Sequence, residues 1–501
     1  MNKVRYVTGA IFAIAAFLLV MMCMPHTGAI YTHDTQSYEY AASTLLESGE
    51  IRYFGYDTPI IQWPPFYILI AAFIRLIGIP LAQGAAWVNA VAFAYLLYAS
   101  ALFLMDQLKV KWLAVPALLL MTASVPLVFV SGYAWTEMTF IFLSVLSVIF
   151  MLQYFEKDKK GWFYASAVMS SLCWLTRYVG VVVVAVLSLM LFIKIKPFVE
   201  KMKNTFIYLF ISCIPMALWV ARNYLISETF TGGRQPGIYT LEENMELSLE
   251  VFKSWTSWLN PLFTCIATAF FLFLVILAAA LKKEKKKKVP GSLPALFTFI
   301  LYIAGYSAVI LASATASAMD PISTRLWAPV FPIWIYFMVF LMDILVRRIK
   351  TEKLKKWMAA GFTLFALTAL VNPVAWIKSE ALPRKDILTG SKEAPEIKNS
   401  PVIALVCETL KPSEDILVIS NEASILAMHT GFKCYYPPKK TGIPLYLFDR
   451  YNERTEDFKS IYLVWVGDME SESFMDIPVF REKYEMTSVA RNNCCTIFRI
   501  R

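Results

Sequence analysis

The sequence has few charged residues for its length. Asp, Glu, Lys and Arg make up only 17% of its 501 residues, whereas hydrophobic residues make up 58%. Soluble domains carry about a quarter charged residues, so this composition excludes an ordinary water-soluble protein of this size. Repeated apolar runs of roughly 20 residues, such as 262–281, are long enough to cross a bilayer. The sequence therefore predicts a polytopic α-helical membrane protein.

Several features that would assign other functions are also missing. No Asn-x-Ser/Thr sequon occurs, so nothing indicates a glycosylated eukaryotic ectodomain. The eight cysteines lack metal-ligand spacing, and no internal repeat of the kind common in transporters is visible. The net charge of +10 comes from short basic clusters between apolar runs. That pattern favours cytoplasmic loops of a membrane protein over nucleic-acid binding.

The basic clusters determine the predicted topology. If all of them face the cytoplasm, an even number of crossings must separate each cluster from the next. Segment 66–79 contains Arg75 and has only about 14 residues, which favours an interfacial position over a span. The first apolar run lacks a signal-peptide cleavage site and is counted as a span. The eleven predicted spans are 6–25, 84–105, 112–131, 137–154, 162–176, 178–193, 204–224, 261–281, 293–313, 326–345 and 357–376.

This topology predicts a multi-pass protein of the cell membrane with a cytoplasmic N-terminus and two domains. Residues 1–376 form the transmembrane domain, with large outer loops at 26–83 and 225–260. Residues 377–501 have balanced charge and alternating patterns, which predict a small extracytoplasmic α/β domain. Its predicted elements are helices 401–410 and 421–431, strands 415–420, 432–436 and 460–466, and two strands near the end.

Four cysteines lie in this second domain. If the compartment is oxidising, a disulfide among them is possible, although the pairing cannot be deduced from the sequence. They are Cys407, Cys434, Cys494 and Cys495.

Arginines gather on the predicted outer side, whereas the inner loops hold mostly lysine. The planar guanidinium fork suits phosphate or carboxylate, so several together indicate an anion site. The alternative for any one of them is that it merely reaches the lipid headgroups. The six arginines are Arg52, Arg75, Arg177, Arg222, Arg234 and Arg325.

The first outer loop contains the strongest candidate for chemistry. An amphipathic helix is predicted over Thr35–Glu47, with Gly49 ending it. Asp34 would lie where the first span emerges, at the boundary of water and lipid. The alternative is that Asp34 is only the N-cap of this helix. Tyr38, one turn further, either contacts substrate or is an interfacial belt tyrosine.

These residues carry a resemblance to a known family. Asp34, Tyr38, an A-x-x-L-x-x-x-G helix and a Pro-Pro-Phe-Tyr segment resemble the integral membrane type C glycosyltransferases (GT-C). The most similar members are the bacterial protein-mannosyltransferase-like and aminoarabinose-transferase-like families. The resemblance extends over most of residues 1–345. Its further motifs are GYAWTE with Glu137, LTRYVG with Arg177, WVARNY with Arg222 and STRLWAPVFP with Arg325.

The resemblance implies a function and roles for these residues. Such enzymes transfer a sugar, with inversion, from a polyprenyl-phosphate donor to a glycan, lipid or protein acceptor. Asp34 would be the base that takes the proton of the acceptor hydroxyl, and Glu137 would orient the acceptor or the partner of Asp34. The alternative for Glu137 is a carboxylate placed favourably at a helix N-terminus. Arg325, Arg222 and Arg177 would stabilise the phosphate leaving group.

The sequence departs from the aminoarabinose-transferase pattern in the first outer loop. Ser37 stands where that pattern has a basic residue, and Gln62 and Trp63 replace an acidic and a basic residue. Donor contacts and any metal site of that subfamily are therefore not carried over. No cofactor is predicted. His33 is a lone histidine, which argues against a metal site there, and the need for a divalent metal stays open.

Two other functions compete with this interpretation. A transporter or lipid flippase would place buried charges within its spans, and Asp343 is the single acidic candidate of that kind. A receptor or structural protein would use its outer domain for binding. That function is less favoured, because eleven spans are more than an anchor needs.

Overall fold

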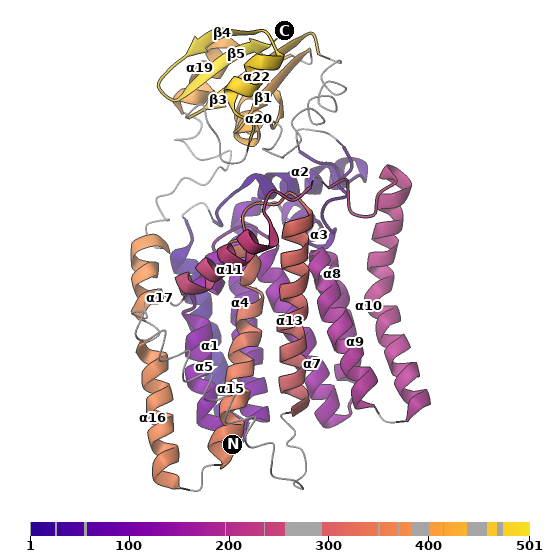
Figure 1. Cartoon of the computed structure of the whole chain (residues 1–501), viewed down its shortest axis with the longest axis vertical. Coiled ribbons are helices and arrows are strands. Elements are labelled where there is room, and N and C mark those ends of the chain that lie inside the picture. Colours follow the sequence, from indigo (N-terminus) through magenta and orange to yellow (C-terminus); the bar gives the residue numbers. More distant parts are fainter. Residues whose placement is uncertain are drawn as a thin grey trace.

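The computed structural model describes residues 2–25, 28–54, 58–195, 197–234, 236–255, 293–348, 351–368, 371–381, 400–413, 415–437, 458–467 and 474–500. These residues form a bundle of long helices and a small sheet domain, which lies over one end of the bundle (Figure 1). We call this end the upper end. The N-terminus lies at the lower end (Figure 1).

The upright helices of the bundle, with the short helices that flank them, follow the predicted apolar runs. They are α1 (Asn2–Cys23), α4 (Leu81–Gln107), η1 (Lys111–Leu113), α5 (Ala114–Thr122), α6 (Val125–Ser131), α7 (Glu137–Lys157), α8 (Lys160–Thr176), η2 (Tyr178–Gly180), α9 (Val181–Lys194), α10 (Phe198–Ser227), α13 (Leu293–Ala316), α14 (Thr324–Trp327), α15 (Val330–Arg348), α16 (Glu352–Thr368), α17 (Val371–Trp376) and η4 (Ile377–Ala381).

Within the described residues, six helices are long and apolar enough to cross a membrane, and a bent pair raises the number to seven. The chain is therefore a multi-span membrane protein, as predicted. The predicted span 261–281 lies outside the described residues. Helix α8 has only 17 residues, and the apolar segment from Tyr178 to Lys194 is equally short. The total of eleven spans and the domain boundary after residue 376 stay predictions.

The third predicted span is not one straight helix. Helices α5 and α6 meet at a bend of 48°, where a single span over 112–131 was predicted. Ser124 is extended, with ψ at 134°, and Pro126 occupies the first turn of α6. Proline has no N–H to donate and its ring clashes with the carbonyl four residues earlier, so α5 cannot continue through it. The apolar composition predicted the membrane location, and Pro126 accounts for the break.

Two short helices between α1 and α4 lie at the upper end of the bundle (Figure 1). Helix α2 (His33–Ser48) ends at Gly49, whose φ of 76° is the left-handed conformation of a helix C-cap. Helix α3 (Phe66–Leu76) has 11 residues, too few to span a membrane, in agreement with its predicted interfacial position. The buried face of α2, with Tyr38 and Ala42, packs on α3 in a small core of their own.

The C-terminal residues form the predicted α/β domain. Its sheet has the order β2-β1-β3-β5-β4, in which β2, β1 and β3 are parallel and β5 and β4 are antiparallel. Strand β1 is almost entirely apolar because helices cover both faces of this part of the sheet. The elements are α19 (Pro401–Thr409), β1 (Ile416–Ser420), α20 (Ala423–Thr430), β2 (Lys433–Tyr435), β3 (Ser460–Val466), α22 (Ile477–Lys483), β4 (Met486–Arg491) and β5 (Cys495–Ile500).

The cysteines of this domain are not joined to one another. Cys407, Cys434, Cys494 and Cys495 are all free in the structure. Cys434 lies on β2 and Cys495 on β5, with β1 and β3 between them. Three strand spacings correspond to roughly 14 Å, twice the Cα separation of about 7 Å that a disulfide tolerates. The sheet order therefore keeps this pair of cysteines apart.

Candidate active site

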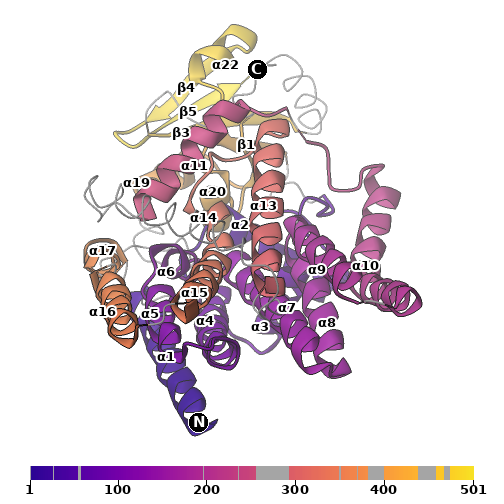
Figure 2. The ribbon, with the colours of Figure 1, turned by 60° about the horizontal axis from the view of Figure 1, so that its bottom comes forward.

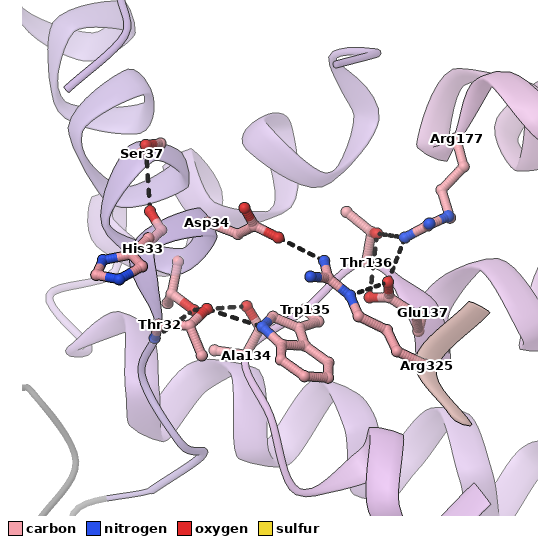
Figure 3. Close-up of polar contacts among 11 residues, drawn as sticks. Thr32, His33, Asp34, Ser37, Ala134, Trp135, Thr136, Glu137, Arg177 and Arg325 are labelled. Atoms are coloured by element: carbon pink, nitrogen blue, oxygen red, sulfur yellow. Dashed lines mark hydrogen bonds and ion pairs between the residues drawn. The ribbon is translucent and has the colours of Figure 1, made fainter. Parts of the chain in front are cut away.

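Four of the predicted site residues meet at the upper end of the bundle, each at a helix end or in a short helix. Asp34 lies in the first turn of α2, Glu137 begins α7, Arg177 follows the last residue of α8, and Arg325 lies in α14. Figure 3 shows the Arg325 guanidinium between the two carboxylates, with Arg177 on the far side of Glu137. The fold brings these residues together from four separate segments of the chain.

Ion pairs connect the four side chains into one network. Arg325 donates from Nη2 to Asp34 Oδ2 and from Nε to Glu137 Oε1, both at 2.5 Å. Arg177 also pairs with Glu137 Oε1, and it donates to Thr136 Oγ1 at 2.8 Å. The Glu137 side chain is fully buried, whereas those of Arg177, Arg325 and Asp34 keep 19–26% of their surface. The network is thus buried at its centre and open at Asp34 and the arginines.

Hydrogen bonds between distant segments fix the position of Asp34. The backbone at Ile30 forms a parallel bridge to Tyr133, and Thr35 Oγ1 donates to Ala134 O at 3.1 Å. Trp135 Nε1 donates to Thr32 Oγ1 at 2.8 Å. The start of α2 is therefore tied to the segment that leads into α7. This arrangement holds Asp34 and Glu137 at fixed positions on either side of Arg325.

The N-cap interpretation of Asp34 is wrong. The N-cap of α2 is Thr32, whose backbone N–H donates to Thr35 Oγ1 at 3.1 Å. Asp34 lies two residues further on, and its carboxylate points at Arg325 (Figure 3). The carboxylate is therefore available for electrostatics and chemistry.

Aromatic residues pack beside the Arg325 guanidinium. Its central carbon lies 4.2 Å from the centroid of the Trp135 ring, a cation–π contact. Trp135 in turn stacks on Tyr133 with ring centroids 3.9 Å apart. Trp135 and Thr136 were not predicted as site residues. The GYAWTE motif contained both, but only its Glu137 carried an obvious chemical signal.

Burial and charge shift the pKa values of groups around the network. Burial alone lowers the pKa of Arg325, but the carboxylates of Glu137 and Asp34 outweigh it and raise this pKa above the ordinary value. Burial raises the pKa of the Tyr38 hydroxyl well above its usual range and lowers the pKa of His33. Arg325 therefore stays cationic, whereas Tyr38 stays neutral at physiological pH.

Tyr38 and Arg222 do not join the ion-pair network. Tyr38 is only 2% exposed, with its ring 5.1 Å from those of Trp63 and Tyr67, so the belt position at the membrane surface is wrong. Arg222 donates to the backbone oxygen of Ile60 at 2.6 Å and lies over Trp219. Direct contacts of Tyr38 or Arg222 with substrate stay predictions.

Arg222 belongs to a second polar cluster, which holds the loop before α3. Tyr178 donates to the backbone oxygen of Ile61 at 2.8 Å, and Asn223 Nδ2 reaches the same oxygen at 3.4 Å. Arg234 reaches the backbone oxygen of Gln62 at 3.4 Å. The upper end of α10 and the 177–180 turn thus clamp residues 60–62 beside the ion-pair network.

Asp343 has a structural position at the lower end of the bundle. Its Oδ1 accepts the backbone N–H groups of Lys109 and Val110 at 3.0 and 2.8 Å, and its Oδ2 pairs with Arg347 at 2.9 Å. These contacts fasten the turn after α4 to α15. This arrangement gives Asp343 an anchoring role, in contrast to the transport role that would support a flippase.

The C-terminal domain also contacts the start of α2. The Tyr436 hydroxyl hydrogen-bonds His33 Nδ1, and the two rings lie edge to face with centroids 5.0 Å apart. Tyr436 is stacked on Phe474 at 5.6 Å. Among the residues that the structure describes, no group of three or more His, Cys, Asp or Glu side chains is arranged to hold a metal ion.

Residues 50–231 match the family described as dolichyl-phosphate-mannose-protein mannosyltransferase. No curated protein sequence matches the chain.

The fold is similar to those of solved ArnT and oligosaccharyltransferase structures. ArnT from Cupriavidus metallidurans in the apo state superposes with a TM-score of 0.61 and 12% identity, covering 98% of this chain and 97% of that chain. ArnT bound to undecaprenyl phosphate gives 0.58 with the same identity and coverage. The oligosaccharyltransferase of Archaeoglobus fulgidus gives 0.53 at 12% identity, covering 96% of this chain and 73% of its own. Residues 50–231 of this chain are thus similar to that mannosyltransferase family, and the fold of the whole chain is similar to that of ArnT.

Proposed function

We propose that this protein is an inverting glycosyltransferase that takes a sugar from a polyprenyl-phosphate donor. The observation that carries the proposal is Arg325 held between a partly open carboxylate, Asp34, and a buried one, Glu137. The name of the matched family includes a dolichyl-phosphate-linked sugar, and a structure of ArnT has been solved with bound undecaprenyl phosphate. Both support a lipid-phosphate donor at this network.

In the proposed reaction, an acceptor hydroxyl attacks the anomeric carbon of the donor. The bond from that carbon to the phosphate oxygen breaks, the configuration inverts, and polyprenyl phosphate leaves. A neutral hydroxyl is a poor nucleophile, so its proton must pass to a base during the attack. Asp34 has the suitable position, because one oxygen pairs with Arg325 and the other points away from it (Figure 3).

The pairing of Asp34 with Arg325 suggests an exchange of partners. Arg325 uses Nε and Nη2 for the two carboxylates, and a guanidinium has five N–H donors. A donor phosphate can therefore bind the remaining donors or draw Nη2 away from Asp34. In the second case the base becomes free only when the donor is in place. Arg177 adds a second positive charge beside the leaving group.

Glu137 acts as a positioning residue in this mechanism. Its side chain is fully buried and pairs with both Arg325 and Arg177, so it does not reach an acceptor from its present position. It holds two like-charged side chains close together, where they would otherwise repel each other. No cofactor enters the proposed reaction, because the base and the cationic groups are side chains of the chain itself.

We further propose that the upper end faces the outside of the cell. The N-terminus lies at the lower end, Arg5 and Lys157 both pair with Asp106, and cytoplasmic loops are enriched in lysine. Residues 1–376 would then form the membrane-embedded catalytic domain. Residues 377–501 would form an extracytoplasmic domain over the site. The acceptor, whether a glycan, a lipid or a protein, would enter from this side.

Comparison of envelope lipids and glycoconjugates tests the proposal. Cells that lack this gene should accumulate a polyprenyl-phosphate sugar and lose one glycosylated product, both detected by mass spectrometry. Reintroducing the parent sequence should reverse both changes, and Asp34→Asn at equal protein level should not. An unchanged lipid-linked sugar pool in the deletion strain would contradict the proposed function. Restoration by Asp34→Asn would remove Asp34 as the base.

A further inference from the structure

Helix α11 (Leu241–Trp255) presents an exposed apolar stripe at the upper end of the bundle. Leu241, Met245, Leu249 and Phe252 are 51%, 51%, 57% and 37% exposed. At 100° per residue these four positions fall within an arc of about 80° on the helix. Figure 1 shows α11 slanted across the upright helices, and not aligned with them.

The other two faces of α11 differ sharply from this stripe. One face packs on the protein, with Asn244, Ser248, Val251 and Trp255 buried. The remaining face is acidic and exposed, and it holds Glu242, Glu243, Glu246 and Glu250. A helix with a protein face, an apolar face and a charged face suits the boundary between a bilayer and water. The charged face can stay in water while the stripe enters the hydrocarbon.

The neighbours of α11 place the stripe next to a membrane-facing surface. Asn244 Nδ2 donates to Thr315 Oγ1 at 3.2 Å, so α11 begins beside the upper end of the long helix α13. Helix α13 itself exposes an apolar face along one side. The residues of this face are Phe297, Ile300, Ala304, Ala308 and Ala312. The stripe on α11 lies beside the end of the helix that carries this face.

The protein face of α11 grips the short helix that carries Arg325. Trp327 Nε1 donates to Ser248 Oγ at 3.1 Å, and Trp255 Nε1 donates to Thr324 Oγ1 at 3.3 Å. These contacts lie on either side of Arg325 in the sequence. Helix α14 has only four residues, so its own backbone hydrogen bonds cannot fix its orientation. Figure 2 shows α11 near α13 and α14.

Phe252 connects the two faces. Its ring belongs to the exposed stripe, and it also lies 5.0 Å from the ring of Trp327. We propose that α11 is seated in the phospholipid leaflet through Leu241, Met245, Leu249 and Phe252. Contact with acyl chains then holds α14 so that Arg325 faces Asp34 and Glu137. The second half of this inference rests on the proposed function, whereas the first half does not.

Photocrosslinking tests the membrane contact without any assay of transfer. A benzophenone amino acid replaces Leu249 in one variant and Glu246, on the acidic face, in the matched control. Both proteins are irradiated in nanodiscs of phosphatidylcholine, and lipid adducts are counted by mass spectrometry. We expect abundant adducts at position 249 and few at 246. Equal adducts at both positions, crosslinks from 249 to protein, or adducts that need added polyprenyl phosphate would overturn the inference.

A second experiment tests the connection to Arg325. Leu249→Ser should lower transfer in nanodiscs about four-fold to ten-fold, because a half-exposed leucine loses its hydrocarbon contact. Glu246→Ser makes a similar change in helix propensity and should have little effect. In an Arg325→Lys background, Leu249→Ser should cost much less than alone. Fully additive effects would refute the connection. Absence of transfer in the parent protein would refute the proposed function and leave the crosslinking result standing.

Discussion

Replacing Arg325 with lysine separates the geometry of the guanidinium from its charge. Arg325 spans two carboxylates at once, with Nη2 on Asp34 and Nε on Glu137, each at 2.5 Å. A lysine ammonium is a single point of charge and cannot keep both contacts in the same plane. It would also alter the cation–π contact with Trp135. We therefore expect Arg325→Lys to fold but to bind the donor phosphate poorly.

The size of the effect follows from the hydrogen bonds that a lysine at position 325 cannot make. A hydrogen bond to a charged group contributes about 1.5–3 kcal/mol, which corresponds to roughly a ten-fold to hundred-fold change in rate or affinity. The assay measures kcat/KM for a short-chain, water-soluble polyprenyl-phosphate sugar in detergent. The decrease in kcat/KM should exceed ten-fold. Thermal unfolding in the same detergent identifies any contribution from reduced stability.

Arg75→Lys is the matched control. Arg75 lies in α3, is about half exposed, and faces Glu47 at 3.6 Å. Such surface pairs contribute about 0–1 kcal/mol, so this substitution should leave kcat/KM nearly unchanged. Equal decreases for the two lysine variants would refute the reasoning. Arg325 would then be one more arginine near lipid headgroups.

Further substitutions and labels test the remaining parts of the interpretation. Asp34→Asn should lower turnover by about 10²-fold or more without unfolding the protein, because the amide cannot take a proton. Glu137→Gln should destabilise the fold by roughly 3 kcal/mol, seen as a lower unfolding temperature, because two arginines lose their buried partner. Asp343→Asn should leave transfer intact, whereas a proton-coupled transporter would lose its activity. A cysteine at Glu246 should react with an impermeant reagent added outside intact cells, and one at Lys159 should not; the reverse pattern would invert the topology.

Local patterns made much of the architecture predictable. Apolar runs predicted the long helices, because bilayer burial constrains each segment independently of the others. Alternation and turn residues predicted β1, β2 and β3 to within one or two residues. Helix α22, with only seven residues, was missed because so short a segment gives no clear period.

The network of the site was only partly predictable. The sequence indicated four site residues, Asp34, Glu137, Arg177 and Arg325. It did not indicate which of them pair with each other. Asp34 and Arg325 are separated by 291 positions in the sequence, and no local pattern encodes such a contact. Likewise the N-cap of α2 is Thr32 and not Asp34. The Thr32 hydroxyl accepts a hydrogen bond from Trp135, which lies 103 positions further along the chain, so the sequence around Asp34 does not reveal this cap.

The six arginines on the predicted outer side have different roles in the folded protein. Arg325 and Arg177 share the buried Glu137, and Arg325 also pairs with the partly open Asp34, so these two arginines are the ones proposed to bind a phosphate. Arg222 and Arg234 donate to backbone oxygens of the loop before α3. A guanidinium has five N–H donors and a planar shape, which suit this structural role.

The two remaining arginines take neither role. Arg52 and Arg75 pair with exposed glutamates, Glu50 and Glu47, on the surface. An excess of arginine over lysine on one side of a membrane protein thus indicates hydrogen-bond acceptors in general, and these include carboxylates and backbone carbonyls of the chain itself. A buried carboxylate shared between two arginines, as at Glu137, is what distinguishes Arg177 and Arg325 from the other four.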